Sequence, residues 1–151
     1  MKSKKTYLFK NTVYRERSES ARTVFSGPGE LKISPAPEFD GSPEALNPEE
    51  MFVAAINDCL MTTFYYFVRK SDIEVLSYHS NAAGRVEKGP GGFRFTNVEV
   101  QAEVSLQRED MAEKALELGD LAEKYCLISR SLACPVQYFL AVQGKETQGQ
   151  K

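Results

Sequence analysis

The amino-acid sequence predicts one α+β domain, with a sheet on one side and helices on the other. Hydrophobic and polar residues alternate over several short segments, a pattern typical of strands with one buried face. Two longer segments have the spacing and end signals of helices, and glycine- and proline-rich turns separate several elements. The 151 residues are enough to bury a core unaided, so residues 1–151 are predicted to form a single domain.

The first part of the chain predicts an antiparallel meander of three strands. Tyr7–Arg17 alternates, Arg22–Phe25 is a second short run, and Glu30–Ser34 resumes the alternation. The segment Ser26-Gly27-Pro28-Gly29 between the last two runs is a strong turn signal. A loop rich in proline, glycine, serine and acidic residues follows over residues 35–45.

A helix is predicted from Asn47-Pro48-Glu49-Glu50 to about Arg69-Lys70. Asn47 can cap it, Pro48 suits its first position, and the two glutamates favour the positive end of the helix dipole. Apolar or small residues occupy nearly every face, so we expect a central, largely enclosed helix. Asn57, Asp58 and two threonines interrupt the apolar segment, which argues against a membrane span.

The remainder predicts two strands, a second helix and a closing strand. The strands cover Ile73–Glu87 and Gly92–Leu106, on either side of a glycine-rich turn. The second helix covers Arg108 to about Lys124, with apolar residues spaced for one buried stripe. Val136–Val142 is the closing strand, and a polar tail begins at about residue 144.

Composition and charge narrow the function. The formal net charge is −2, without the basic excess usual in nucleic-acid binders. The basic N-terminal residues 1–5 are not followed by a continuous apolar segment, so no signal peptide is indicated. We therefore expect a cytoplasmic protein that binds neither nucleic acid nor membrane. Three cysteines in a reducing compartment favour redox or catalytic use over a disulfide framework.

The cysteines are Cys59, Cys126 and Cys134, and the one histidine is His79. No zinc-ligand spacing is present, so we expect no metal and no cofactor. Cys59 and Cys126 are 67 residues apart, and spacing alone does not show that they meet. Each could be a small buried apolar residue. We assign packing to Cys134 and a structural or solvent-facing position to His79.

Three sets of residues resemble the family of osmotically inducible protein C and organic hydroperoxide resistance proteins (OsmC/Ohr). Near the first cysteine the matching residues are Asn47-Pro48-Glu49-Glu50-Met51-Phe52-Val53-Ala54-Ala55 and Cys59-Leu60. Near the second they are Ala122-Glu123-Lys124-Tyr125-Cys126 and Ser129. Between them lie Gly84-Arg85-Val86 and Gly91-Gly92-Phe93. The resemblance runs from about Tyr7 to Val142 and indicates a divergent OsmC-like subgroup.

This resemblance implies an antiparallel sheet wrapped on a buried central helix, in an intertwined homodimer with active sites at the interface. It also implies a thiol peroxidase. Cys59 would attack the O–O bond of an organic hydroperoxide and become a sulfenic acid, and Cys126 would condense with it to a disulfide. A dithiol, a lipoyl-bearing protein in relatives, would then reopen the disulfide.

The resemblance further implies a cation that favours ionisation of the Cys59 thiol. Glu49 matches the family's glutamate that steers an early-strand arginine, although plain stabilisation of the helix start explains Glu49 equally well. For the arginine, Arg22 is the first candidate, with Arg15 and Arg17 as rivals. Ten residues of helix rise about 15 Å, so Glu49 and Cys59 would meet only through a bend or across subunits.

Two other functions stay open. Asp58, where relatives carry a small apolar residue, would disfavour a thiolate if it lay close to Cys59, and the arginine has no matching motif. Both points favour a non-catalytic member that binds an apolar ligand or senses redox state. A hydrolase with Cys59 as acyl nucleophile lacks a well-placed base. The aromatic residues Phe64–Phe67 either line a pocket for an apolar peroxide or belong to the core.

Overall fold

The computed structural model describes residues 5–17 and 20–143. The predicted polar tail, residues 144–151, lies outside the described residues. The chain forms two compact units, residues 1–52 and residues 53–151. The assignment of the whole chain to one domain stays a prediction.

The first unit contains the predicted antiparallel meander. Its strands are β1 (Asn11–Tyr14), β2 (Ala21–Phe25) and β3 (Glu30–Ile33), paired in that order. The first strand is shorter than the predicted Tyr7–Arg17, because β2 offers partners to only four of its residues. A one-turn 3-10 helix, η1 (Pro37–Phe39), interrupts the loop that was predicted after β3.

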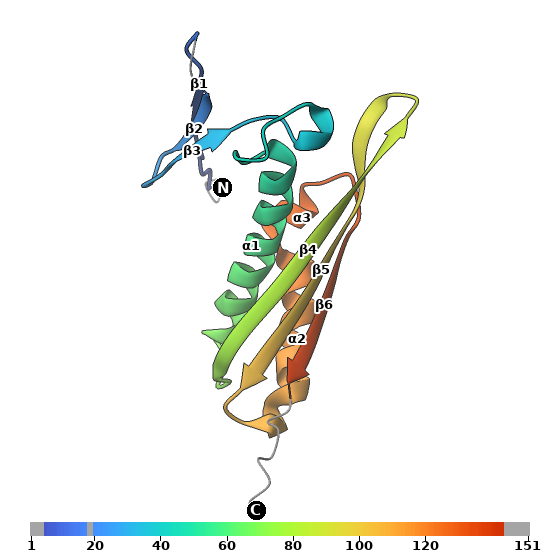
Figure 1. The fold of residues 1–151 in the computed structure, drawn as a ribbon. Helices are drawn as coiled ribbons and strands as arrows, with labels where there is room; N and C mark the ends of the chain where they lie inside the picture. The colour runs from blue at the N-terminus through green and yellow to red at the C-terminus, as the bar shows by residue number, and fades with distance from the viewer. Residues whose placement is uncertain (1–4, 18–19, 144–151) are drawn as a thin grey trace, which may run out of the picture. The chain divides into compact units, whose positions relative to one another are not determined.

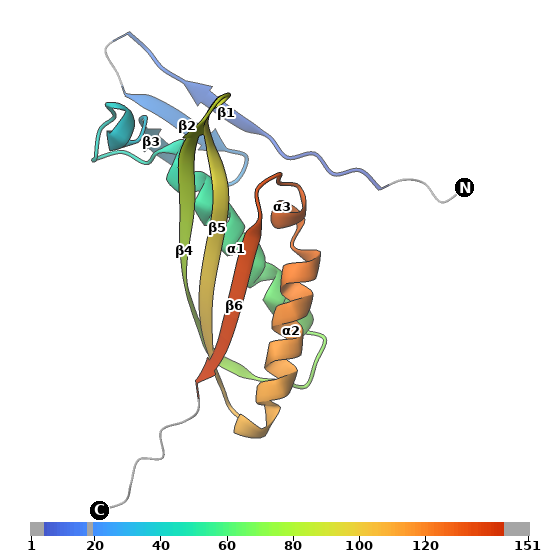
Figure 2. The same cartoon turned by 90° about the vertical axis from the view of Figure 1, so that its right-hand side faces the viewer.

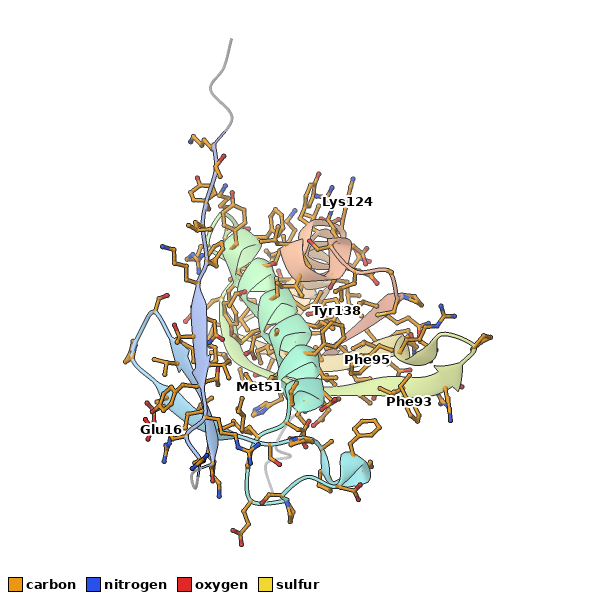
Figure 3. The ribbon with its side chains drawn as sticks, turned by 90° about the horizontal axis from the view of Figure 1, so that it is seen from above. Glu16, Met51, Phe93, Phe95, Lys124 and Tyr138 are labelled. Atoms are coloured by element: carbon orange, nitrogen blue, oxygen red, sulfur yellow. The ribbon has the colours of Figure 1, made fainter. Side chains whose placement is uncertain are left out.

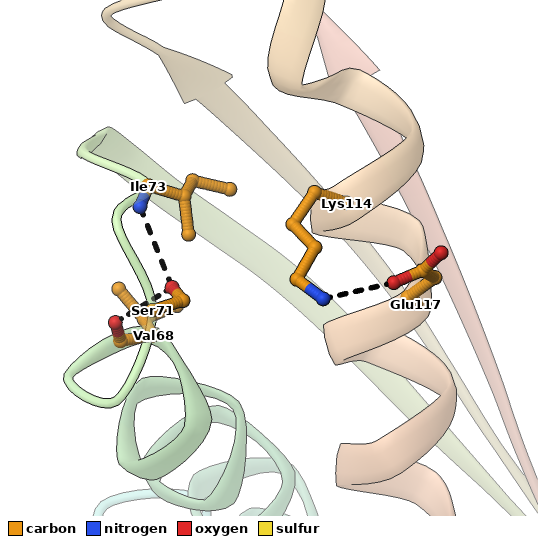
Figure 4. Close-up of polar contacts among 5 residues, drawn as sticks. All are labelled: Val68, Ser71, Ile73, Lys114 and Glu117. Carbon is orange, nitrogen blue, oxygen red and sulfur yellow. Dashed lines mark hydrogen bonds and ion pairs between the residues drawn. The ribbon is translucent and has the colours of Figure 1, made fainter.

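Helix α1 (Pro48–Val68) begins as the sequence predicts. The Asn47 side-chain Oδ1 accepts a hydrogen bond of 2.8 Å from the Glu50 backbone N–H, and Pro48 occupies the first helical position. The helix ends at Val68, slightly before the predicted Arg69-Lys70. There Ser71 Oγ donates to the Val68 carbonyl at 2.8 Å and accepts from the Ile73 N–H at 3.4 Å (Figure 4).

Burial along α1 differs from the predicted enclosure. Its fully buried residues recur every four positions and form one stripe: Ile56, Leu60, Phe64 and Val68. Ala54, Ala55, Thr62 and Tyr66 are exposed. The single chain therefore covers one face of a helix that is apolar on several faces. In the described part of the chain, α1 alone is long and apolar enough for a membrane span, a test that core helices also pass.

The second unit is built on a sheet of three strands, β4 (Val75–Gly89), β5 (Gly92–Leu106) and β6 (Val136–Gln143). β4 and β5 form the predicted antiparallel hairpin. β6 pairs parallel to β5, whereas the family resemblance implied an antiparallel sheet. The reason is the connection: η2 (Glu109–Met111) and α2 (Ala112–Tyr125) follow β5 and return the chain to the starting end of that strand.

Helices α1 and α2 lie on the same face of this sheet (Figures 1 and 2), as the predicted α+β layering requires. Alternate residues of β5 point into the core: Val98, Val100, Ala102, Val104 and Leu106. The hydroxyls of Tyr78 and Tyr138 lie 3.0 Å apart in the same layer, and burial raises the pKa of both tyrosines. On the solvent side of α2, Lys114 pairs with Glu117 at 3.0 Å (Figure 4).

A close approach of α1 to the sheet requires Gly84 in β4. A Cβ at this position would lie 2.7 Å from the Phe95 ring (labelled in Figure 3) and 2.7 Å from Val53 Cγ2. We therefore expect Gly84→Ala to lower the free energy of unfolding by about 1–3 kcal/mol, the usual range for overpacking. Urea unfolding followed by circular dichroism measures this difference.

Gly91→Ala is the matched control, because nothing lies within 4 Å of the added Cβ there. Its stability should stay near that of the parent. Equal stability of Gly84→Ala and the parent protein would contradict the close approach.

Candidate functional site

Cys59 lies on α1 and is half-buried. It directly precedes Leu60, a member of the buried stripe. Its Sγ is 4.0 Å from the Thr63 hydroxyl, one turn further along the same helix. Asp58 is exposed, so the neighbouring carboxylate faces solvent.

Cys126 lies at the junction of two helices and is fully buried. It follows the last residue of α2 and precedes the four-residue helix α3 (Leu127–Arg130), which the sequence did not predict. The Ser129 hydroxyl donates a hydrogen bond of 3.1 Å to Cys126 Sγ. Burial raises the pKa of the Cys126 thiol, and the side chain and backbone N–H of Ser129 oppose that rise by hydrogen bonding to the sulfur.

The structure brings Cys59 and Cys126 together. Cys59 is among the groups that raise the pKa of the Cys126 thiol, so the two side chains lie near each other. Both thiols are free, so the pair is in its reduced form. Two neighbouring thiols, one reached by solvent and one enclosed, are suited to forming and breaking a disulfide. Spacing in the sequence did not reveal this proximity.

The third cysteine, Cys134, and the one histidine, His79, lie elsewhere in the chain. Cys134 is half-buried in the loop before β6, and its packing role stays a prediction. His79 is exposed on β4. Among residues 5–17 and 20–143, no cluster of three or more His, Cys, Asp or Glu residues could hold a metal ion.

A groove of about 690 Å³ lies beside the thiol pair. Its lining comes from α1, α2 and the turn after α1: Thr62, Thr63, Tyr66, Phe67, Arg69, Leu121 and Tyr125. Thr63 contacts Cys59, so the groove begins one helical turn from that sulfur. Tyr66 and Phe67 of the predicted aromatic cluster line it, whereas Phe64 is buried in the core. The contribution of Leu121 was missed; its spacing of four from Tyr125 on α2 was the available signal.

Glu49 lines a different pocket, of about 850 Å³, within the first unit. Arg15 and Lys32 line the same pocket. Glu49 Oε2 is buried and has no hydrogen-bond partner among the residues that the structure describes. A buried carboxylate oxygen in a pocket with two cationic side chains is suited to holding a guanidinium or ammonium group.

Arg22, the first candidate from the sequence, is engaged elsewhere in this unit. Its guanidinium pairs with Glu30 at 3.0 Å across β2 and β3. Tyr14 donates to the other oxygen of Glu30 at 3.1 Å. Neither Arg22 nor Arg17 is among the described residues that line the Glu49 pocket. Of the three arginines considered, the structure places Arg15 in that pocket.

The fold and the two neighbouring thiols define a two-cysteine site on an α+β scaffold. The family model for OsmC-like protein matches residues 40–139, a span that includes both thiols. The chain therefore belongs to the OsmC-like family, as the sequence motifs indicated.

Solved structures agree with this assignment. An OsmC-like protein of unknown function from Vibrio cholerae is 23% identical, with a TM-score of 0.82, covering 90% of this chain and 100% of that one. An organic hydroperoxide resistance protein from Elizabethkingia anophelis is 19% identical, with a TM-score of 0.72, covering 94% and 99%. A Legionella pneumophila organic hydroperoxide resistance protein is 20% identical, with a TM-score of 0.67, covering 93% and 100%.

These structural similarities establish the OsmC/Ohr fold. At such low identity they do not establish an activity, for which the chemistry of the site is the relevant evidence. The search of curated proteins finds no match.

Proposed function

We propose that the chain is a cytoplasmic thiol-dependent peroxidase that reduces organic hydroperoxides to alcohols. The observation that carries the proposal is the proximity of Cys59 to Cys126 in a chain of the OsmC-like family. A two-cysteine peroxidase needs two neighbouring thiols, because the oxidised sulfur must meet its partner before it is oxidised further.

The proposed steps are those that the family resemblance implies for the two cysteines. The Cys59 thiolate attacks the terminal oxygen of the hydroperoxide, the O–O bond breaks, and the alkoxide that leaves takes a proton to become the alcohol. Cys59 becomes a sulfenic acid. The Cys126 sulfur then attacks Cys59 Sγ, water leaves, and a disulfide forms. An external dithiol, for which we propose the dihydrolipoyl group of a lipoylated protein, restores both thiols by exchange.

The groove beside Cys59 supports an apolar substrate. Tyr66, Phe67 and Tyr125 give it aromatic walls, and the Phe67 and Tyr125 rings lie 5.8 Å apart. Apolar walls with a few polar groups are typical of small-molecule sites. A hydroperoxide with an alkyl or aryl body would bury that body in the groove, whereas hydrogen peroxide has no such group to bury.

The same groove is also compatible with a second function, that of a non-catalytic protein that binds an apolar ligand or senses redox state. The two functions are separated by the fate of the thiols. A binding protein would take up an apolar ligand and still retain its full thiol count after exposure to a hydroperoxide.

We expect one equivalent of cumene hydroperoxide to consume two thiols and to leave an intramolecular Cys59–Cys126 disulfide. Cys59→Ser should abolish peroxide consumption, because the attacking sulfur is gone. Cys126→Ser should leave a sulfenic acid at Cys59 that dimedone traps. Thiol titration and peptide mapping measure these outcomes.

Cys134→Ser is the matched control and should consume peroxide at the parental rate. A main bridge that contains Cys134, or an unchanged thiol count in the parent protein, would overturn the proposal.

We also propose that the protein is a homodimer. Apolar or small residues of α1 remain exposed in the single chain, including Ala54, Ala55 and Tyr66. Tyr7, Leu8 and Phe9 are also exposed, each by at least 75%. Exposed apolar surface of this extent is typical of an interaction face, and a second copy of the chain is the occupant that the family resemblance implies.

Sedimentation velocity at micromolar concentration should therefore show a dimer. Ala55→Arg should shift the protein toward monomer, because the interface would have to bury an unpaired charge. Gln101→Arg, at an exposed position on β5, should leave the dimer intact. A fully active monomer of the parent chain would contradict this proposal.

For the cation, we propose that Arg15 assists Cys59 and that Glu49 orients Arg15. The support is that these two residues share a pocket in the first unit, while Arg22 pairs with Glu30. Arg15→Ala should lower the rate constant of peroxide reduction at least tenfold, about 1.4 kcal/mol of barrier. Stopped-flow assays of single turnovers measure the rate constant.

Arg22→Ala is the matched control, since a surface ion pair contributes little, and its rate should stay near the parental value. The reverse result, a slow Arg22→Ala and an unchanged Arg15→Ala, would return the role to the arginine that the sequence favoured. Arg17→Ala should resemble the parent.

A further inference from the structure

The two sulfurs of the site differ in access. Cys59 is half-buried, so solvent reaches part of its side chain. Cys126 has no exposed surface. Thiol–disulfide exchange requires the incoming thiolate to approach the sulfur that it attacks. In a Cys59–Cys126 disulfide, access therefore favours attack at Cys59 Sγ.

The two sulfurs also differ in hydrogen bonding. The Ser129 hydroxyl donates a hydrogen bond of 3.1 Å to Cys126 Sγ. Cys59 Sγ lies 4.0 Å from the Thr63 hydroxyl, and either of these two atoms could be the donor. Negative charge on a sulfur is stabilised by donors that already point at it. The structure provides such donors at Cys126.

We propose that the disulfide is reopened in one direction, with the external thiolate attacking Cys59 and Cys126 leaving as a thiolate held by Ser129. The inference rests on the proposed function and deepens its reductive half-reaction. It assigns Ser129 a catalytic role, because its hydroxyl touches a sulfur whose bond breaks.

The exchange balances as follows. One sulfur of the dithiol, as a thiolate, forms a bond to Cys59 Sγ while the Cys59–Cys126 bond breaks, and the electron pair goes to Cys126 Sγ. That thiolate then takes a proton. The second sulfur of the dithiol attacks the first, releases Cys59 as a thiolate and closes the reductant's own disulfide. The dithiol is oxidised by two electrons, and the protein disulfide is reduced by two.

The Ser129 hydrogen bond matters in this step because the Cys126 sulfur is buried away from water. Burial is the largest cause of the raised pKa of Cys126, and the Ser129 hydroxyl is the first contribution that lowers it. A buried thiolate without donors is a poor leaving group, and leaving-group pKa affects the rate of exchange. The Ser129 hydroxyl therefore offsets part of the free-energy cost of placing negative charge on the buried Cys126 sulfur when the disulfide breaks.

A purely structural role for Ser129 is the alternative, and Ser131 shows what such a role looks like. The Ser131 hydroxyl donates to the Leu127 backbone carbonyl at 2.8 Å, which satisfies the end of α3. The Ser129 hydroxyl donates to the sulfur instead. Ser131→Ala is therefore a matched control for Ser129→Ala, two residues away.

The first experiment measures disulfide reduction separately from peroxide chemistry. The Cys59–Cys126 disulfide is made with diamide in a Cys134→Ser background, and its reduction by dihydrolipoamide is followed. Ser129→Ala should slow reduction about tenfold, as expected for a lost hydrogen bond to a charged group, and should leave sulfenic acid formation at Cys59 unchanged. Ser131→Ala should match the parent, and Ser129→Thr, which keeps the hydroxyl, should recover most of the rate.

The second experiment identifies the attacked sulfur in the Cys134→Ser parent, so it does not depend on the folding of a Ser129 variant. The disulfide is treated briefly with 2-mercaptoethanol and quenched with iodoacetamide. Peptide mapping should find the mixed disulfide on Cys59 and the alkyl group on Cys126.

The opposite pattern, or a parental reduction rate in Ser129→Ala, would overturn the inference. Equal slowing of both half-reactions would also overturn it, because that result indicates a structural role. Diamide forms the disulfide without peroxide, so disulfide reduction can be measured even if the protein does not reduce hydroperoxides. Failure of this inference and failure of the peroxidase proposal therefore give different results.

Discussion

The packing of α1 on the β4–β5–β6 sheet determines where the chemistry lies. Successive helical residues are rotated by about 100°, so the buried stripe through Leu60 fixes the direction of every other α1 side chain in the second unit. Asn57 lies on one side of the stripe and accepts a 2.7 Å hydrogen bond from Ser80 of β4. Cys59 lies on the other side, where it is near Cys126. A rotation of α1 by one residue would separate the two thiols.

The site combines two requirements that oppose each other. Enclosure of Cys126 protects it from bulk solvent and from unwanted partners, but it also disfavours the thiolate that exchange chemistry uses. The short helix α3 places Ser129 against the sulfur and so supplies hydrogen bonds that water would otherwise make. Cys59 remains half-buried, so part of its side chain stays in contact with solvent. The asymmetry of the pair thus follows from the local fold around each cysteine.

Local signals in the sequence predicted local structure well. The Asn47 cap, the β1–β3 meander and the alternation along β5 depend on residues close in the chain. The antiparallel sheet that the family resemblance implied did not include the parallel pairing of β6 with β5. That pairing depends on the path of α2, which no property of Val136–Gln143 encodes. The predicted enclosure of α1 was wrong for the single chain because composition shows how much surface is apolar, not what covers it. The proximity of Cys59 to Cys126 came from motif resemblance, since 67 residues of intervening chain leave their distance undetermined.

Asp58 shows why residue identity must be considered together with direction. A carboxylate next to a reactive thiol disfavours its ionisation when the two groups face each other in a low dielectric. On α1, Asp58 lies about 100° of rotation beyond Cys59 and away from the buried stripe, and it is exposed. Solvent around an exposed carboxylate screens its charge strongly. The departure from the family pattern that argued most directly against a working thiolate is therefore compatible with one, because the rotation that buries Leu60 also turns Asp58 outward.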